Sequence, residues 1–259
     1  MIPQIRNLIL AATVALPFSL MATTSSNANE LTEERVLELV DQYVRDNPQV
    51  LLESINRFVE EERARESQRE LQAARNMVDE LANSDGVPVV GNPDAETTIV
   101  YVIDAACGFC RQMTPVFADL RDNMDDVRII HRWVPFLGAS SEYAGRVAQL
   151  MWNRHEPRYD EFYTALMNQR SPLTNELVDA VIEEVLGADA VDGIKADIAF
   201  GSDAELFAQR VNENLNLAQR AQIRGTPFTM VVHGGNIDVH RGAIDVGTLA
   251  RSVSSVRGD

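Results

Sequence analysis

Cysteine is scarce in this chain of 259 residues, which contains only Cys107 and Cys110. One pair of cysteines cannot build a framework of structural disulfides, and no second pair completes a four-cysteine zinc site. The four histidines lack the spacing typical of zinc ligands; they are His131, His155, His233 and His240. We therefore expect no metal and no other cofactor, and the two thiols themselves are the candidates for chemistry.

Positive charge is also in short supply, because 23 lysine and arginine residues stand against 39 aspartate and glutamate residues. The formal net charge of −16 at pH 7 repels the phosphate backbone of nucleic acids and anionic lipid surfaces. A nucleic-acid partner is therefore not expected.

A long apolar run occurs only near the N-terminus, at residues 8–21, where it follows Arg6 and precedes Ser26-Asn27-Ala28. This order is typical of a secretory signal peptide with a small-residue cleavage site. The run is interrupted by Pro17 and is shorter than the ~18–20 residues of a membrane span, so cleavage is favoured over an uncleaved anchor. We expect residues 1–28 to be removed and the mature protein to be exported.

Residues 29–84 are predicted to form a helical extension. Thr32 is suited to cap a first helix, and Asn47-Pro48 is suited to end it and begin a second. Apolar residues recur at helical spacing, at Val36, Leu37, Val40 and Val44, at Leu51, Leu52, Ile55, Phe58 and Val59, and again at Leu71, Ala74, Val78 and Leu81. These stripes require cover, either from the following domain or from copies of the same chain. The charged segment at residues 60–70 separates two packing surfaces, which favours self-association.

The remaining chain reads as an α/β fold. Residues 97–103 are nearly all apolar or β-branched, as in a strand buried on both faces, and residues 127–133 form a second strand after an intervening helix. This βαβ order predicts a parallel pair. Residues 139–221 are predicted to be a helical insertion, residues 228–233 and 237–240 to be strands, and residues 245–256 to be a last helix. The sheet is thus expected in two parts, within residues 85–138 and 222–259.

Cys107 and Cys110 lie where the first buried strand runs into a helix. A thiol at a helix N-terminus faces unpaired backbone N–H groups, which lower its pKa, and a second thiol one turn later can resolve a mixed disulfide. We interpret Cys107 as the nucleophile and Cys110 as the more buried resolving thiol. Gly108 and Phe109 between them offer no cation or side-chain donor, so we predict a milder oxidant than a protein with histidine in this loop.

Taken together, the motifs resemble the DsbA-like thiol-disulfide oxidoreductases of the bacterial periplasm, which have a thioredoxin fold, and in particular the ScsC-like branch with an N-terminal helical extension. The matching residues are Tyr43, Asn47-Pro48, Pro88, Gly91-Asn92-Pro93, Asp104, Cys107-Gly108-Phe109-Cys110, Pro135-Phe136-Leu137-Gly138, Ser140, Ala144, Tyr159, Phe162, Leu166-Met167, Asn214, Ala218, Gly225-Thr226-Pro227 and Gly242-Ala243. The resemblance covers nearly all of the expected mature chain.

The resemblance implies that Pro227 is a cis-proline lying against the dithiol and that Thr226 pairs with the backbone of a client protein. Gly108 and Phe109 are implied to contact the client as well. Asp104 is implied as a proton acceptor for Cys110, although a role in capping the strand end remains open. The chain departs from the family pattern at Ala105, where an aromatic residue is usual, and at Phe228, where a small residue is usual.

The leading hypothesis is a periplasmic disulfide isomerase or reductase that acts on exported, cysteine-containing clients and is kept reduced by a membrane redox partner. Threonine before the cis-proline is typical of isomerases and reductases, and relatives with the extension are trimers. One alternative is a monomeric dithiol oxidase. Another is a Cu(I)-binding or holdase protein, for which Met113 is the only nearby thioether.

Overall fold

The computed structural model describes residues 32–259, so the expected signal peptide at residues 1–28 lies outside the described residues. Contacts between residues divide the chain into two units, of which the first ends at Val59 and the second runs from Glu60 to Asp259. The helical extension expected at residues 29–84 is thus split between the two units.

In the first unit, the described residues form α1 (Glu33–Asp46) and the first turns of α2 (Pro48–Asn76). The hydroxyl of Thr32 accepts a hydrogen bond from the backbone N–H of Arg35 at 3.3 Å, which caps the start of α1. At the other end, the side-chain amide of Asn47 donates to the carbonyl of Tyr43 at 2.9 Å. Both predicted helix ends are therefore confirmed.

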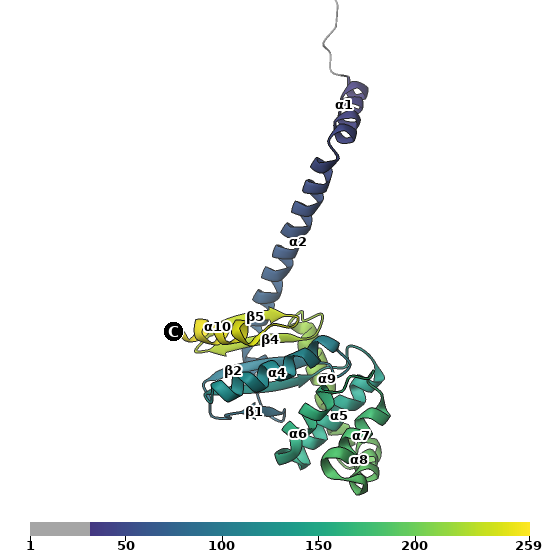
Figure 1. Cartoon of the computed structure of the whole chain (residues 1–259), viewed down its shortest axis with the longest axis vertical. Coiled ribbons are helices and arrows are strands. Elements are labelled where there is room, and N and C mark those ends of the chain that lie inside the picture. The colour runs from purple at the N-terminus through teal and green to yellow at the C-terminus, as the bar shows by residue number, and fades with distance from the viewer. Residues whose placement is uncertain (1–31) are drawn as a thin grey trace, which may run out of the picture. The chain divides into compact units, whose positions relative to one another are not determined.

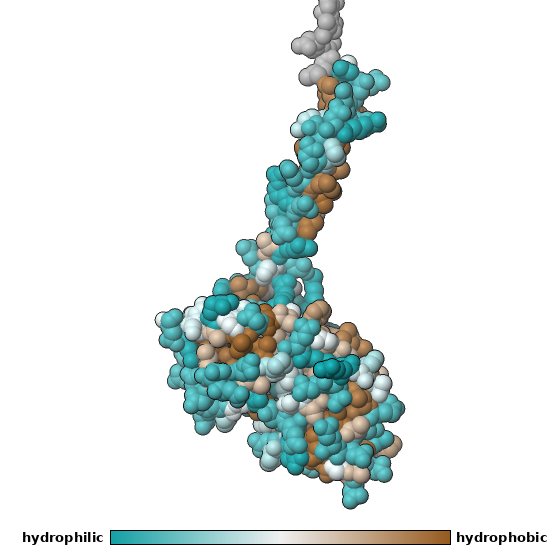
Figure 2. Space-filling view, in the orientation of Figure 1, coloured by the Kyte–Doolittle hydropathy of each residue, from teal (hydrophilic) through white to brown (hydrophobic). Residues whose placement is uncertain are grey.

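The apolar stripes of α1 and of the start of α2 are exposed to solvent. Helix α1 contains no buried residue. Leu37, Leu52 and Phe58 are 62%, 61% and 61% exposed. Figure 2 shows brown, apolar surface along one side of the two helices. A contiguous apolar face of this kind marks an interaction surface, and no other described residue of this unit covers it.

The second unit takes up the end of α2 and adds α3 (Val78–Ala82). Ala74 and Leu81 are 0% and 1% exposed and belong to a buried cluster that also contains Ala218 and Phe228. The last stripe of the extension is therefore covered by its own domain.

A five-stranded mixed sheet forms the centre of the second unit, with strand order β1-β3-β2-β4-β5 (Figure 1). The strands are β1 (Val89–Gly91), β2 (Thr97–Ile103), β3 (Val127–Trp133), β4 (Phe228–His233) and β5 (Asn236–Arg241). Strands β2 and β3 are parallel and the other pairs are antiparallel. The βαβ unit and the two later strands predicted from the sequence are confirmed, and β1 is an addition.

The sheet separates two buried clusters because successive residues of a strand face opposite sides. Along β2, Ile99, Tyr101 and Ile103 belong to the cluster that includes α4 (Gly108–Asn123) and α10 (Val246–Arg257). Val100 and Val102 belong to the cluster on the other face. All seven residues of β2 are buried, as its continuous apolar pattern predicts.

The predicted helical insertion is confirmed between β3 and β4. It contains α5 (Ala139–Arg154), α6 (Glu156–Met167), α7 (Asn175–Leu186), α8 (Ala188–Phe200) and α9 (Ala204–Arg220). Helix α5 contacts each of the other four, and α9 contacts β3. Figure 1 shows α5 to α8 gathered beside the sheet. The insertion begins directly after the loop that follows β3. Because β2 and β3 are parallel, both strands end at the same edge of the sheet, and the start of α5 contacts the end of β2 through Ser141 and Asp104.

Candidate active site

The candidate site forms where β2 ends and α4 begins. Cys107 is the N-cap residue of α4, with extended backbone angles of φ −77° and ψ 113°. Its N–H donates to the carbonyl of Asp104 at 3.0 Å, which closes the turn between strand and helix. The Cys107 side chain thus stands at a helix N-terminus, where backbone N–H groups without helical partners favour a negative charge.

Asp104 fixes this turn through its side chain. One carboxylate oxygen accepts from the N–H of Ala106 at 2.8 Å and from the hydroxyl of Ser141 at 2.6 Å. The other accepts from the N–H of Leu137 at 2.8 Å. Asp104 is fully buried. These bonds tie the end of β2 to the loop after β3 and to α5, as the strand-end capping role requires.

Cys107 has a strongly acidified thiol. Its pKa is lowered to about 5, chiefly because the thiol of Cys110 donates a hydrogen bond to its sulfur. The Thr226 side chain and the backbone N–H groups of Phe109 and Cys110 act in the same direction and outweigh the opposing effect of burial. The residue is only 8% exposed, less than its position at a helix start suggests.

The pKa of Cys110 is shifted in the opposite direction. It is 0% exposed, and burial raises its pKa far above the usual value for a thiol. The hydroxyl of Tyr101 donates to its backbone carbonyl at 3.0 Å, which anchors this turn of α4 to β2. An ionised Cys107 beside a protonated Cys110 supports the predicted assignment of nucleophile and resolving thiol.

The loop before β4 lies against the dithiol. The peptide bond between Thr226 and Pro227 is cis, as the resemblance implies. The thiol of Cys107 donates to the carbonyl oxygen of Thr226, with the sulfur 3.2 Å from that oxygen. Phe109 is 61% exposed, and no atom outside its immediate neighbours lies within 4 Å of the space a Cβ would fill on Gly108. The structure therefore brings Cys107 and Thr226 together and leaves the Gly108-Phe109 side of the site open.

Other polar groups near the site are committed to structure. His131 shares a hydrogen bond of 2.9 Å with the hydroxyl of Tyr159, and burial lowers the pKa of its ring to about 3, so it stays neutral. Met113 is fully buried, and its sulfur accepts from the N–H of Ile244 at 3.3 Å. Within residues 32–259, no three or more Cys, His, Asp or Glu side chains are grouped so that they could hold a metal ion.

Sequence reasoning missed a feature of the cis-proline loop. Arg224, two residues before Thr226, forms an ion pair of 2.6 Å with Glu66 of α2. The partners are far apart in the sequence, and no local pattern joins them. The charged segment at residues 60–70 was the only available signal.

Comparison with known proteins agrees with this geometry. A family profile described as Thioredoxin matches residues 83–247. The chain belongs to the thioredoxin family.

Three relatives extend the comparison. The crystal structure of BcfH from Salmonella enterica Typhimurium has a TM-score of 0.72 and 23% identity, with 87% of this chain and 96% of that chain covered. ScsC of Proteus mirabilis in a transitional conformation has a TM-score of 0.61 and 25% identity, with 90% and 99% covered. Disulfide bond formation protein D of Bacillus subtilis (strain 168) is 25% identical over 150 residues, which are 56% of this chain and 68% of that protein.

These likenesses confirm the resemblance to DsbA-like and ScsC-like proteins and support a thioredoxin-fold thiol-disulfide oxidoreductase. None of the helices described within residues 32–259 combines the length and the apolar character that a membrane span requires.

Proposed function

We propose that this protein exchanges thiols and disulfides of exported proteins in the periplasm, chiefly as a disulfide isomerase or reductase. One observation carries the proposal: the pKa of Cys107 is about 5 beside Thr226, while burial raises the pKa of Cys110. At neutral pH the first sulfur is a thiolate and the second a thiol. Because only the thiolate is nucleophilic, Cys107 attacks the client disulfide first, while Cys110 remains a protonated thiol.

In the first step the Cys107 thiolate attacks one sulfur of a client disulfide, and the other client sulfur leaves as a thiolate. A client thiolate that then attacks the client sulfur bound to Cys107 releases Cys107 as a thiolate and leaves a rearranged client with no net transfer of electrons. If Cys110 attacks the sulfur of Cys107 instead, its proton passes to the departing client sulfur. Two electrons then move from the dithiol to the client, which is reduced.

The pKa values of the two thiols favour rearrangement of the client disulfides over early release of the client by Cys110. Cys107 is a good leaving group because its pKa is low, whereas attack by Cys110 is slow because its pKa is raised. A mixed disulfide therefore has time to be resolved within the client. Each reduction leaves a disulfide between Cys107 and Cys110, and a membrane redox partner would return two electrons to it.

The client surface in this proposal consists of Gly108, Phe109, Thr226 and Pro227. The carbonyl of Thr226 accepts from Cys107 when that residue is a thiol. On ionisation the sulfur has no proton to donate, so the carbonyl becomes available to the backbone N–H of a client.

The exposed apolar face of α1 and early α2 supports the further proposal of a homo-oligomer, with a trimer favoured. Burying side chains such as Leu37, Leu52 and Phe58 between copies removes apolar area from water. Several dithiols would then surround one misfolded client, which suits isomerisation.

The test uses the mature chain, residues 29–259, and two double variants that each add two negative charges. Leu52→Glu with Phe58→Glu changes the apolar face, and Gln49→Glu with Asn56→Glu changes positions of the same helix outside the stripe. We expect the first variant to sediment as a monomer and to lose reactivation of scrambled ribonuclease while still reducing a peptide disulfide. The control should keep both activities. A wild-type protein that oxidises a reduced peptide, sediments as a monomer and never reactivates scrambled ribonuclease would instead be a dithiol oxidase.

A further inference from the structure

A cavity of about 310 Å³ lies beside the cis-proline loop and is lined in part by Thr226 and Pro227. Its walls include Ile223 and Phe228, which are 3% and 2% exposed. Thr226 also contacts the sulfur of Cys107, so the cis-proline loop forms part of the wall of this cavity and also lies against the nucleophile. The cavity is therefore placed to contact residues of a client that neighbour its reacting cysteine.

Charged side chains surround this apolar floor. Glu66 from α2 and Arg224 from the loop both line the cavity and form an ion pair with a nitrogen–oxygen distance of 2.6 Å. The side chains of Glu66 and Arg224 are 44% and 72% exposed. Exposed ion pairs contribute little free energy, because both partners are well solvated when they separate. Another carboxylate can therefore replace that of Glu66 at low cost.

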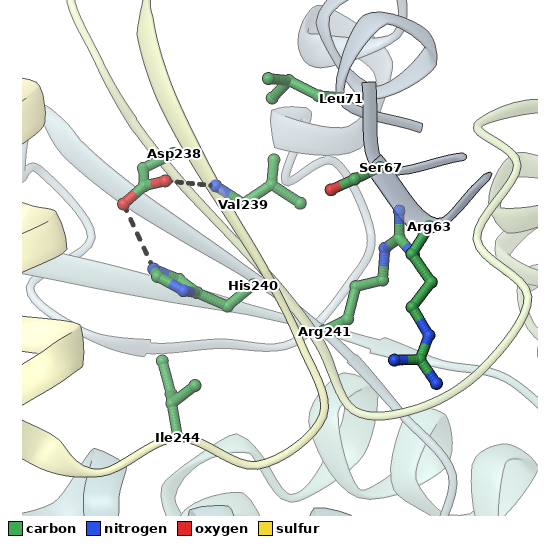
Figure 3. A pocket seen from close by; sticks show the side chains of 8 residues that line it. All are labelled: Arg63, Ser67, Leu71, Asp238, Val239, His240, Arg241 and Ile244. Atoms are coloured by element: carbon green, nitrogen blue, oxygen red, sulfur yellow. Dashed lines mark hydrogen bonds and ion pairs between the residues drawn. The ribbon is translucent and has the colours of Figure 1, made fainter. Parts of the chain in front are cut away.

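Arg241 lines this cavity and also a second one of about 480 Å³. Figure 3 shows the second cavity, where Arg63, Ser67 and Leu71 of α2 face the residues of β5. Three arginines, Arg63, Arg224 and Arg241, line the two cavities together with two acidic residues, Glu66 and Asp238. The formal charges of these five side chains sum to +1, opposite in sign to the net charge of −16 of the chain.

We propose that Arg224 selects client segments that carry an acidic side chain near the reacting cysteine. Glu66 holds the guanidinium of Arg224 in the free protein, and a client carboxylate takes its place when the client binds. The inference rests on the proposed function, since it names the chemistry of the clients that the same site prefers.

Local charge outweighs net charge at this site. At physiological ionic strength the screening length is about 8 Å, so most of the acidic residues act weakly on a side chain in the cavity. Arg224 lines the cavity and can contact such a side chain directly. An acidic client side chain thus gains a contact that a neutral one lacks, while the negative charge of Glu66 limits the size of the gain.

The experiment measures binding separately from chemistry. Two fluorescein-labelled peptides carry a central serine in place of cysteine and differ only in having glutamate or glutamine two positions away on each side. We expect the mature protein to bind the glutamate peptide about threefold more tightly, as measured by fluorescence anisotropy at physiological ionic strength. The ratio of the two dissociation constants should fall towards one as sodium chloride is added.

Three variants locate the preference. Arg224→Gln should bring the ratio to one, and Glu66→Gln should raise it, because the competing carboxylate is gone. The matched control is Arg220→Gln, which breaks a comparable exposed ion pair with Glu80 away from this cavity and should keep the wild-type ratio. Equal binding of the two peptides, absence of binding by both, or a preference that survives in Arg224→Gln would overturn the inference.

Cysteine versions of the same peptides separate this inference from the proposed function. If their mixed disulfides with glutathione fail to react with Cys107 while the serine peptides keep their ratio, the proposed exchange is wrong and the binding preference stands. If they react equally fast with or without glutamate, and the serine peptides bind equally, the exchange stands and the preference is wrong.

Discussion

The sulfur of Cys107 lies 3.2 Å from the carbonyl oxygen of Thr226, to which its thiol donates a hydrogen bond. That contact exists only in the thiol form. The thiolate instead accepts hydrogen bonds, above all from Cys110. Ionisation of one sulfur therefore activates the nucleophile and frees the carbonyl of Thr226 as a hydrogen-bond acceptor in the same event.

The first prediction concerns the pH dependence of Cys107. Its pKa of about 5 means that the thiolate is present at neutral pH and is lost as the pH falls through 5. The rate of alkylation by iodoacetamide should therefore reach half its plateau near pH 5. In Cys110→Ala the main hydrogen-bond donor is gone, so the midpoint should move up towards the usual thiol range of about 8.5.

The control for this measurement is Cys107→Ala, which iodoacetamide should not label between pH 4 and pH 7, because the remaining thiol of Cys110 is buried and its pKa is raised. An unchanged midpoint in Cys110→Ala would mean that the helix N-terminus, rather than the second thiol, stabilises the charge. The same variant should accumulate mixed disulfides with clients, because nothing remains to resolve them.

A second prediction separates the two roles considered for Asp104. Its carboxylate accepts from Ala106, Leu137 and Ser141, so Asp104→Ala would leave one buried donor, the Ser141 hydroxyl, and two partly buried N–H groups without partners. We expect a loss of about 3 kcal/mol in the free energy of unfolding, measured in urea.

Asp104→Asn keeps the size of the side chain but cannot take a proton from Cys110. If Asp104 acts as a proton acceptor, this variant slows release of a trapped client in a pH-dependent way; as a cap alone, it leaves the pH profile unchanged.

Arg132 carries the third prediction. Its guanidinium is buried and donates to the carbonyls of Glu80, Leu81 and Asn83 and to the side chain of Asn214 at 3.1 Å. Burial lowers its pKa to about 10, so it remains charged at neutral pH. Arg132→Met should lower the free energy of unfolding by about 2–4 kcal/mol, because it leaves buried carbonyls at the end of α3 without donors.

Arg128→Met on the same strand is the matched control for urea unfolding. The side chain of Arg128 is partly exposed and bonds to the hydroxyl of Thr98 at 2.7 Å, so its loss should cost about 1 kcal/mol. Equal losses in the two variants would contradict a special role for Arg132.

Local sequence patterns predicted most of the sheet. Residues 97–103 form a continuous apolar run, and such a run specifies a buried strand without reference to the rest of the chain. Strand β1 has no such pattern, since it is three residues long and depends on its pairing with β3. The cis peptide at Pro227 followed from the family pattern and not from local preference.

The contacts that the sequence could not predict join residues far apart in the chain. The sequence of residues 127–133 indicates a strand with polar positions. It gives no sign that Arg132 donates hydrogen bonds to the end of α3. Likewise, Asp104 is one acidic residue after a strand until the start of α5 supplies Ser141. These partners are set by the tertiary fold.

The extension shows the same limit. Its stripes look alike in sequence, yet Leu52 and Phe58 are exposed whereas Ala74 and Leu81 are buried in the second unit. Periodicity identifies a face that needs cover but does not identify what covers it. The predicted end of the extension at residue 84 therefore differs from the division after Val59.

The last prediction follows from that division. Deleting residues 29–59 removes only the first unit, so the remaining chain should unfold cooperatively and still reduce a peptide disulfide. Deleting residues 29–82 also removes Ala74 and Leu81 from the core and takes away the carbonyls that Arg132 bonds. Loss of a buried leucine costs about 2–5 kcal/mol, and an unpaired buried guanidinium adds several more.

The total is comparable with the whole stability of an ordinary domain, about 5–15 kcal/mol, so the longer deletion should lose its cooperative thermal transition in circular dichroism. Loss of activity on deletion of residues 29–82 would then result from unfolding of the second unit. Only the deletion of residues 29–59 tests the role of the extension in catalysis. Equal melting temperatures for the two deletions would mean that the end of α2 and α3 contribute little to the second unit, against the burial of Leu81.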